Sequence, residues 1–226
     1  MERLLKEKDV EYIKDLFEKN LKDEVTLTLF LETNGPNVTK FNEQYLPYTE
    51  EIVKEVAELS PKIKMNIYRD DPEKEKAYGV KAISALFIEG QKTNKNIVYY
   101  GIPSGHEFSS LLEDIIDVSK GETELPIDIK EKVRKITSKV EILVFVTPTC
   151  PYCPRAVRTA HQFALENPNI VGAMIEANEF PDWSNQYNVY AVPKVVINEG
   201  KAEFEGALPE DAFLQSVYEA LGIKLV

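Results

Sequence analysis

The stretch VEILVFVTPTCPYCPRA, residues 140–156, contains the chain's two cysteines, Cys150 and Cys153, directly after an apolar run rich in β-branched residues. Such a run predicts a buried strand, and the longer segment with helical spacing after it predicts a helix. A sulfur at the start of a helix lies beside backbone N–H groups that have no intrahelical partner, and these groups stabilise a thiolate. Pro151 suits the first helical position, where its missing N–H costs little. The stretch therefore predicts a strand, a reactive Cys-x-x-Cys turn and a helix in succession.

The two cysteines occupy different places in such a turn. Cys150, at the exposed tip, is expected to attack a disulfide of a partner protein and form a mixed disulfide. Cys153, one helical turn further in and more shielded, then attacks Cys150 and releases the product. Arg155 and Arg158 place positive charge nearby, which should favour the thiolate. In reverse, the same pair donates its disulfide to a dithiol, so the Cys150–Cys153 disulfide is the redox group and no other cofactor is expected.

Two other uses of a Cys-x-x-Cys pair are weaker interpretations. The pair can form half of a zinc site, or it can form an inert structural disulfide. For zinc, the chain offers no second Cys-x-x-Cys pair, and its only histidines, His106 and His161, lie in different halves. We therefore expect redox chemistry and no bound metal.

The chain contains this pattern twice. Residues 25–41, VTLTLFLETNGPNVTKF, align without gaps with residues 140–156, and residues 78–90 match residues 187–200. Each half predicts the order helix, strand, helix, strand, helix, strand, strand, helix. Helices that alternate with strands and close in a hairpin indicate a mixed sheet covered on both faces. The sequence therefore predicts two similar α/β units in tandem.

The boundary between the units is expected near Gly121, in a polar segment that precedes Pro126. We assign residues 1–120 to the first unit and residues 121–226 to the second. Because the junction is short, the units should pack together and not hang on a flexible tether.

Composition restricts the partners. Of the 226 residues 43% are hydrophobic, and 38 acidic residues against 27 basic ones give a formal charge of −11. Such a surface repels phosphate backbones and anionic lipids, so we expect neither nucleic acid nor a membrane as partner. No apolar run approaches the roughly 18–20 residues of a membrane helix. The charged start MERLLKEKDV lacks the apolar region of a signal peptide, so we expect a cytoplasmic protein.

A proline provides an independent element of the second half. In YAVPKVVI, residues 190–197, Pro193 directly precedes a predicted strand. Proline lacks the N–H that a strand needs for pairing, so it belongs at the start or edge of a strand. It is also the only residue that adopts a cis peptide bond at little cost.

The second half resembles thioredoxin and glutaredoxin through TPTCPYC and AVPKVVI. The whole chain resembles the protein disulfide oxidoreductases of hyperthermophiles, which contain two thioredoxin-like units, through FVTPTCPYCP, QYNVYAVPKVVI, EFEGALPE and GIPSGHEF. The resemblance covers almost all of the chain. The content of 29% charged residues, rich in Lys and Glu, is consistent with a thermophile.

This resemblance implies an enzyme of dithiol–disulfide exchange, related in role to protein disulfide isomerase. Its substrates would be protein disulfides or dithiols, and its electron partner a protein like thioredoxin reductase. It implies a cis peptide bond before Pro193, in a loop against the sulfurs, and a role for the backbone of Val192 in pairing with an extended substrate strand. Tyr152 is expected to contact the partner's chain.

The first unit departs from this family at two positions. The residues aligned with the Cys-x-x-Cys pair are Gly35, Pro36, Asn37 and Val38, which provide no sulfur. Ser84 stands where Pro193 stands in the second unit, so the cis-proline signature is expected to be lost as well. We expect disulfide exchange in the second unit only. The first unit is expected to give structural support and some substrate binding.

Glu176 is our candidate proton acceptor for Cys153, because it lies in the apolar, strand-like run of residues 172–177 and could be partly buried near the sulfurs. The alternative is an acid at the exposed end of a strand.

Two other functions remain open from the sequence. One is a glutathione-linked reductase of the glutaredoxin type, which CPYC would suit. The other is a client-binding, chaperone-like module whose thiols only anchor or sense. The direction of exchange depends on the reduction potential, for which about 30 mV corresponds to about 1.4 kcal/mol.

Overall fold

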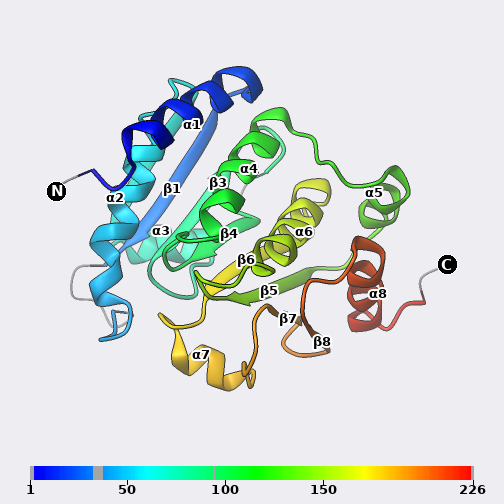
Figure 1. Cartoon of the computed structure of the whole chain (residues 1–226). Coiled ribbons are helices and arrows are strands. Elements are labelled where there is room, and N and C mark those ends of the chain that lie inside the picture. Colours follow the sequence, from blue (N-terminus) through cyan, green and yellow to red (C-terminus); the bar gives the residue numbers. More distant parts are fainter. Residues whose placement is uncertain (1–2, 33–37, 94, 225–226) are drawn as a thin grey trace.

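The computed structural model describes residues 3–32, 38–93 and 95–224, in which a mixed sheet carries helices on both faces (Figure 1). The strands are β1 (Val25–Leu31), β2 (Ile63–Arg69), β3 (Ala85–Glu89), β4 (Ile97–Tyr100), β5 (Val140–Val146), β6 (Ile170–Glu176), β7 (Lys194–Ile197) and β8 (Ala202–Glu205). The helices are α1 (Glu7–Asn20), α2 (Leu46–Ala57), α3 (Pro72–Tyr78), α4 (Glu107–Lys120), α5 (Ile127–Arg134), α6 (Cys153–Glu166), α7 (Pro181–Gln186) and α8 (Glu210–Ala220), and Glu43–Tyr45 form a 3-10 turn.

The two halves have the same topology, which confirms the predicted order of elements. In the first half β1 pairs parallel with β2 and antiparallel with β3, and β3 pairs antiparallel with β4. In the second half β5 has the same relations to β6 and β7, and β7 pairs antiparallel with β8. In β1 and in β5 all residues but the second are buried, as expected for central strands covered on both faces. The expected α/β class with two thioredoxin-like units is confirmed.

The sheets of the two halves are one continuous sheet. β4 pairs parallel with β6, from Ile97 opposite Gly172 to Tyr100 opposite Ile175, and the strand order is β2-β1-β3-β4-β6-β5-β7-β8. α6 passes so close to this junction that a Cβ at Gly172 would lie 2.7 Å from the carbonyl oxygen of Ala160. The expected packing of the units is therefore achieved through backbone hydrogen bonds as well as side chains. The boundary at residues 120 and 121 stays a prediction.

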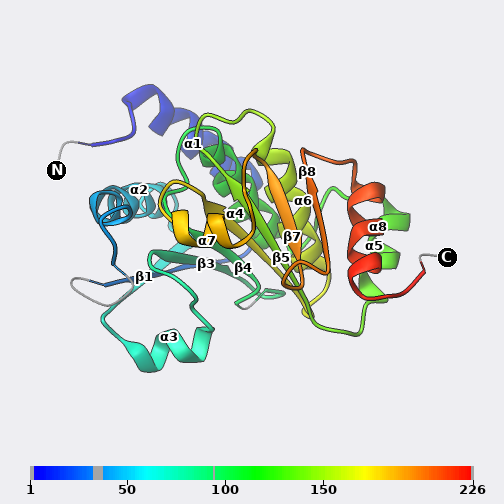
Figure 2. The same cartoon turned by 90° about the horizontal axis from the view of Figure 1, so that it is seen from below.

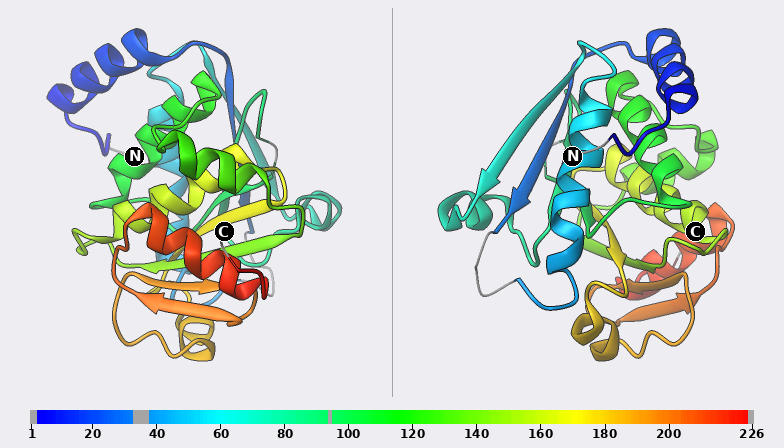
Figure 3. Two further views of the ribbon diagram at one scale, coloured as in Figure 1. Left: turned by 90° about the vertical axis from the view of Figure 1, so that its right-hand side faces the viewer. Right: turned by 60° about the vertical axis from the view of Figure 1, so that its left-hand side comes forward.

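The helices divide unequally between the two faces of the sheet. α1, α2, α4, α5, α6 and α8 contribute to one apolar core, and α3 and α7 pack on the opposite face. Figure 2 shows α3 across the sheet from α1 and α2, and Figure 3 shows the same separation from two other directions. Two short helices cover less of a sheet than six longer ones, so the face with α3 and α7 is the more open.

α4 of the first half and α6 of the second are joined by a buried charge cluster. Arg158 of α6 forms ion pairs with three carboxylates of α4, those of Glu113, Asp114 and Asp117. Asp114 also accepts a hydrogen bond from the Tyr99 hydroxyl, and its Oδ2 lies 2.6 Å from Nδ1 of His161. Burial alone would raise the pKa of Asp114, but Arg158 and His161 bring that pKa below its usual value. The carboxylate is therefore charged inside the protein and depends on Arg158.

Replacement of this guanidinium should destabilise the protein. Arg158→Met leaves the Asp114 carboxylate buried without its main counter-charge, and we expect a loss of about 3–5 kcal/mol in the free energy of unfolding, measured by denaturant titration. The control is Arg155→Met on the same helix, which removes an exposed side chain that lies 3.8 Å from Glu210. We expect this control to change the free energy of unfolding by no more than about 0.5–1 kcal/mol. Equal losses in the two variants would contradict this account of the cluster.

Candidate active site

The Cys-x-x-Cys turn connects β5 to α6. The N–H of Cys150 donates to the carbonyl oxygen of Thr147 at 3.1 Å, and α6 begins at Cys153 with Tyr152 as its N-cap residue. The side chain of Cys150 is 8% exposed and that of Cys153 is fully buried, and both are free thiols. Cys150 therefore lies in the turn before α6, as predicted, but it is almost entirely buried, so the expectation of an exposed tip was wrong.

The helix begins two residues later than predicted. Pro151 lies in the turn and not at the first helical position, and Pro154 occupies the second position of α6. A proline there removes an N–H that has no intrahelical acceptor, so it does not interrupt the helix. The two arginines also differ from expectation, because Arg158 binds the carboxylates of α4 and Arg155 contacts Glu210 of α8. Their charges are thus partly neutralised by other groups.

A loop distant in sequence completes the surface around Cys150. The Val192–Pro193 peptide bond is cis, and the Cys150 thiol donates to the carbonyl oxygen of Val192 at 3.6 Å. Tyr152 and Tyr190, 70% and 89% exposed, present aromatic rings on the two segments. The structure thus brings the predicted residues Cys150, Val192 and Pro193 together, while their roles toward substrate stay predictions.

Cys153 is a protonated thiol in this environment. Burial raises the pKa of Cys153, and its hydrogen bond to Cys150 and the charges of Cys150 and Glu107 raise it further. A thiol attacks a disulfide only after it has lost its proton. The predicted attack by Cys153 would therefore require a proton acceptor near it.

Glu107, the first residue of α4, is a buried carboxyl group whose charge contributes to the raised pKa of Cys153. Glu107 is 1% exposed. Its Oε2 accepts a hydrogen bond from the Ser110 hydroxyl at 2.9 Å, whereas its Oε1 has no hydrogen-bond partner among the residues that the structure describes. Burial raises the pKa of Glu107 to about 7. Near neutral pH this carboxyl group can therefore exist in both protonation states, as a proton acceptor requires.

Glu107 comes from the first half and reaches the second through a close contact of two loops. Gly105 has φ of +61°, and a Cβ there would lie 2.2 Å from the carbonyl oxygen of Pro148. That oxygen accepts a hydrogen bond from the N–H of His106 at 2.9 Å. The turn before α4 is therefore fixed against the loop before Cys150. Our sequence analysis quoted GIPSGHEF without assigning a role to Glu107, because only the fold places that segment beside the cysteines.

Glu176, the acceptor predicted from the sequence, lies at the end of β6 opposite Val146. It is buried, and its carboxylate accepts hydrogen bonds from the N–H of Glu179 and from Asn178 Nδ2, both at 2.8 Å. Burial raises the pKa of Glu176. Its oxygens are thus occupied by neighbours in its own loop, whereas Glu107 has a free one. A catalytic role for Glu176 stays a prediction.

The equivalent loop of the first half differs from expectation. The Ile83–Ser84 bond is cis although no proline follows it, and the carbonyl oxygen of Ile83 accepts a hydrogen bond from Asn42 Nδ2 at 2.5 Å. The proline of the cis-proline signature is absent, as the sequence shows, but the first half retains a cis bond at this position with serine in place of proline. Gly35, Pro36 and Asn37 lie outside the described residues.

Within the described part of the chain, no helix is long and apolar enough to cross a membrane. In the same residues no group of three or more His, Cys, Asp or Glu side chains is placed to hold a metal ion.

Comparison with known proteins assigns this arrangement to a fold class. Residues 140–219 match the family model of the thioredoxin domain. A protein disulfide oxidoreductase from Aeropyrum pernix has a TM-score of 0.83 and 29% identity, over 98% of this chain and 96% of that one. The resemblance expected from the sequence is therefore confirmed: the chain, which contains a Cys-x-x-Cys pair, is similar to thioredoxin-fold disulfide oxidoreductases.

Other similar proteins belong to alkyl hydroperoxide reductases. The structure of the reductase protein AhpF from Enterococcus faecalis has a TM-score of 0.83 and 24% identity, over 95% of this chain and 100% of that one, which shows a shared fold. The corresponding alkyl hydroperoxide reductase protein of Staphylococcus aureus is 27% identical over 149 residues, which are 66% of this chain and 27% of that protein. The match thus spans about a quarter of the length of these curated relatives.

The different environments of the sulfurs predict different reactivity. Iodoacetamide should alkylate Cys150 of the reduced native protein at neutral pH more than about 100-fold faster than Cys153, because Cys153 is buried and protonated. Peptide mass mapping over time measures both rates, and denatured protein, in which both react, is the control. Comparable rates in the native protein would contradict the geometry described here.

Proposed function

We propose that the protein is a protein dithiol–disulfide oxidoreductase that works through Cys150 and Cys153 without another cofactor. The observation that carries this proposal is the pairing of the Cys150 thiol, beside a cis-proline loop, with the fully buried Cys153 thiol at the start of α6. The relatives named above support redox chemistry. Substrates that are protein disulfides, and action in the cytoplasm, belong to the proposal.

The proposed reduction proceeds in two exchanges. The Cys150 thiolate attacks one sulfur of a client disulfide, so that a mixed disulfide forms and the other client sulfur leaves as a thiolate. Cys153 then attacks the Cys150 sulfur, which forms the Cys150–Cys153 disulfide and releases the second client thiolate. The client gains two electrons and the enzyme pair loses them. A dithiol reductant, supplied by an electron partner like thioredoxin reductase, returns the pair to the reduced form, and the reverse sequence oxidises a client dithiol.

In this scheme Glu107 accepts the proton that Cys153 loses as it attacks. The free oxygen of Glu107 and its raised pKa suit that step, and Glu107 belongs to the half that has no cysteine pair. The first half is then part of the catalytic site and not only a support.

Disulfide reduction tests the main proposal. With insulin as substrate and dithiothreitol as reductant, the intact protein should turn over, Cys150→Ser should be inactive, and Cys153→Ser should accumulate a mixed disulfide with insulin, detected by non-reducing electrophoresis. Turnover that survives Cys150→Ser would overturn the assignment. Suppression of aggregation without turnover would indicate a client-binding module, and turnover strictly dependent on glutathione would indicate a glutaredoxin-type reductase.

The pH dependence of the second exchange tests the proton acceptor. Only the ionised form of Glu107 accepts a proton, so the rate of release from the mixed disulfide should rise with pH through about 7. Glu107→Gln should lower this rate by about 100-fold at pH 7.5 and remove the rise. Stopped-flow measurement of product release gives this rate and its dependence on pH in both proteins.

Glu176→Gln separates the two candidate carboxyl groups in the same measurement. We expect it to retain the rise near pH 7 that Glu107→Gln removes. If the rise disappears in Glu176→Gln and persists in Glu107→Gln, the two roles must be exchanged.

The relatives named as alkyl hydroperoxide reductase proteins favour a second candidate function. In that case the chain would pass electrons from a reductant to a partner protein that reduces alkyl hydroperoxides. Consumption of an alkyl hydroperoxide by a reconstituted system of reductant, this chain and a thiol peroxidase would support it, and dependence on Cys150 is again required.

A further inference from the structure

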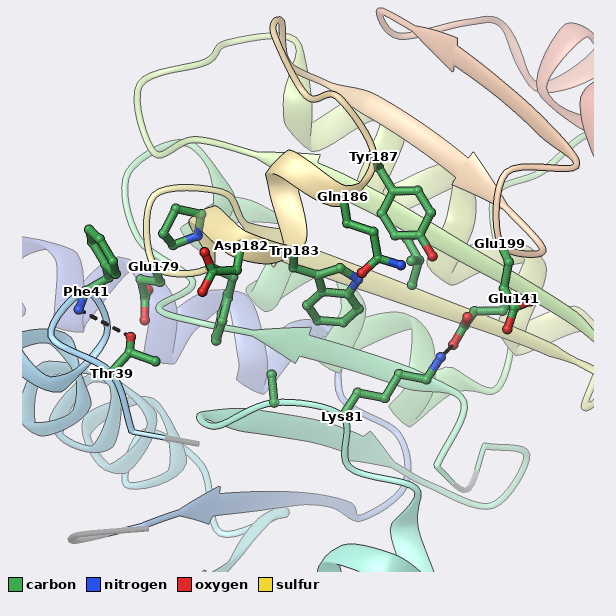
Figure 4. Close-up of a pocket in the computed structure, with 14 residues that line it drawn as sticks. Thr39, Phe41, Lys81, Glu141, Glu179, Asp182, Trp183, Gln186, Tyr187 and Glu199 are labelled. Atoms are coloured by element: carbon green, nitrogen blue, oxygen red, sulfur yellow. Dashed lines mark hydrogen bonds and ion pairs between the residues drawn. The ribbon is translucent and has the colours of Figure 1, made fainter. Parts of the chain in front are cut away.

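A groove crosses the more open face of the sheet between the two halves (Figure 4). It has a volume of about 550 Å³. Phe41 and Lys81 of the first half line one side, and residues 179–187 of the second half, which include α7, line the other. Neither half forms this groove alone.

The floor of the groove is aromatic. Trp183 lies near its centre, half-buried, with its ring centroid 6.3 Å from that of Phe180, and Tyr187 also lines the groove. The inner side of the Trp183 ring packs on Phe145 and Tyr100, with ring centroids 6.1 and 5.3 Å away, so the indole is held in place. A fixed aromatic floor favours an apolar or aromatic side chain of a ligand.

The charges along the groove are mostly negative. The ionisable lining residues are four acids, Glu141, Glu179, Asp182 and Glu199, and one base, Lys81. Burial raises the pKa of Glu179 to about 8, so its carboxyl group adds little charge at neutral pH. Lys81 is paired with Glu141, so its charge is already balanced. Asp182 and Glu199 lie on opposite sides of Trp183, as Figure 4 shows. The groove therefore complements a basic ligand.

The groove is continuous with the surface around Cys150. A second hollow of about 360 Å³ shares Phe41 and Pro181 with it. The other end of that hollow is formed by Tyr190 and Val192 of the cis-proline loop, and the Val192 carbonyl oxygen contacts the Cys150 thiol. A client chain attached to Cys150 can thus extend directly into the groove.

We propose that this groove binds an extended client segment that carries an aromatic side chain flanked by lysine or arginine, next to the cysteine that Cys150 attacks. The proposal rests on the proposed function and names its substrate class. The aromatic side chain would lie on Trp183, and the basic side chains would lie near Asp182 and Glu199. Clients with such a segment are then preferred over clients with an acidic one.

Peptides with one internal disulfide provide the test. Three are compared as substrates with dithiothreitol as reductant: one with Lys-Phe-Lys at both ends, one with Glu-Phe-Glu, and one without tails. The intact protein should show a higher kcat/KM for the Lys-Phe-Lys peptide than for the Glu-Phe-Glu peptide, by about 2–5-fold for each charge contact. Salt should reduce this preference.

A charge reversal locates the preference. Asp182→Lys should lower kcat/KM for the Lys-Phe-Lys peptide and leave that for the tail-free peptide unchanged. Asp211→Lys, an equal change at an exposed residue of α8 outside the groove, is the matched control and should keep the preference. No preference in the intact protein, or equal loss in both variants, would overturn the proposal. Failure to reduce even the tail-free peptide would instead count against the proposed function.

Fluorescence gives a readout that does not depend on turnover. Trp183 is the only tryptophan of the chain, so its emission reports directly on the groove. A Lys-Phe-Lys peptide without cysteine should change this emission in a saturable way, with weaker binding to Asp182→Lys. No saturable change at concentrations where the same tails raise kcat/KM would contradict binding in this groove.

Discussion

The parallel pairing of β4 with β6 is the constraint on which the rest of the structure depends. It joins two four-stranded sheets into one and sets α4 of the first half beside α6 of the second. Arg158 and Asp114 then hold these two helices together through a buried ion pair. Because α6 begins at Cys153 and α4 begins at Glu107, the same pairing brings a carboxyl group to the thiol that most needs a proton acceptor.

This arrangement gives a reason for retaining a first half that has no cysteine pair. Its loop before α4 is fixed against the loop before Cys150, its Glu107 completes the surroundings of Cys153, and its Phe41 and Lys81 line the groove beside α7. A catalytic surface assembled from both halves would lose its proton acceptor and one wall of its groove if the first half were removed. On the proposed mechanism the first half is required although it has no cysteine pair.

Much of the fold and part of the site could be predicted from local sequence. The repeated strand and helix pattern predicted the order of elements and the place of Cys150 between a strand and a helix, and the family resemblance implied the cis bond before Pro193. Three features could not be predicted from local sequence, since each joins segments that are distant in the sequence. They are the pairing of β4 with β6, the effect of Glu107 on Cys153, and the ion pairs of Arg158 with α4. Glu176 was favoured because it lies in an apolar, strand-like run. Pro151 was assigned to the first helical position because its missing N–H costs little there, and helix starts are uncertain by one or two residues.

The central claim is that Glu107, from the first half, exchanges a proton with Cys153 in the second. Infrared difference spectroscopy between the dithiol and disulfide forms, recorded across pH, measures the protonation of a buried carboxyl group directly. We predict a carboxyl band that titrates near pH 7 in the reduced protein, shifts when the disulfide forms, and is absent from Glu107→Gln. A band that is unaffected by Glu107→Gln, or a Glu107 that stays in one protonation state in both redox forms, would contradict the account.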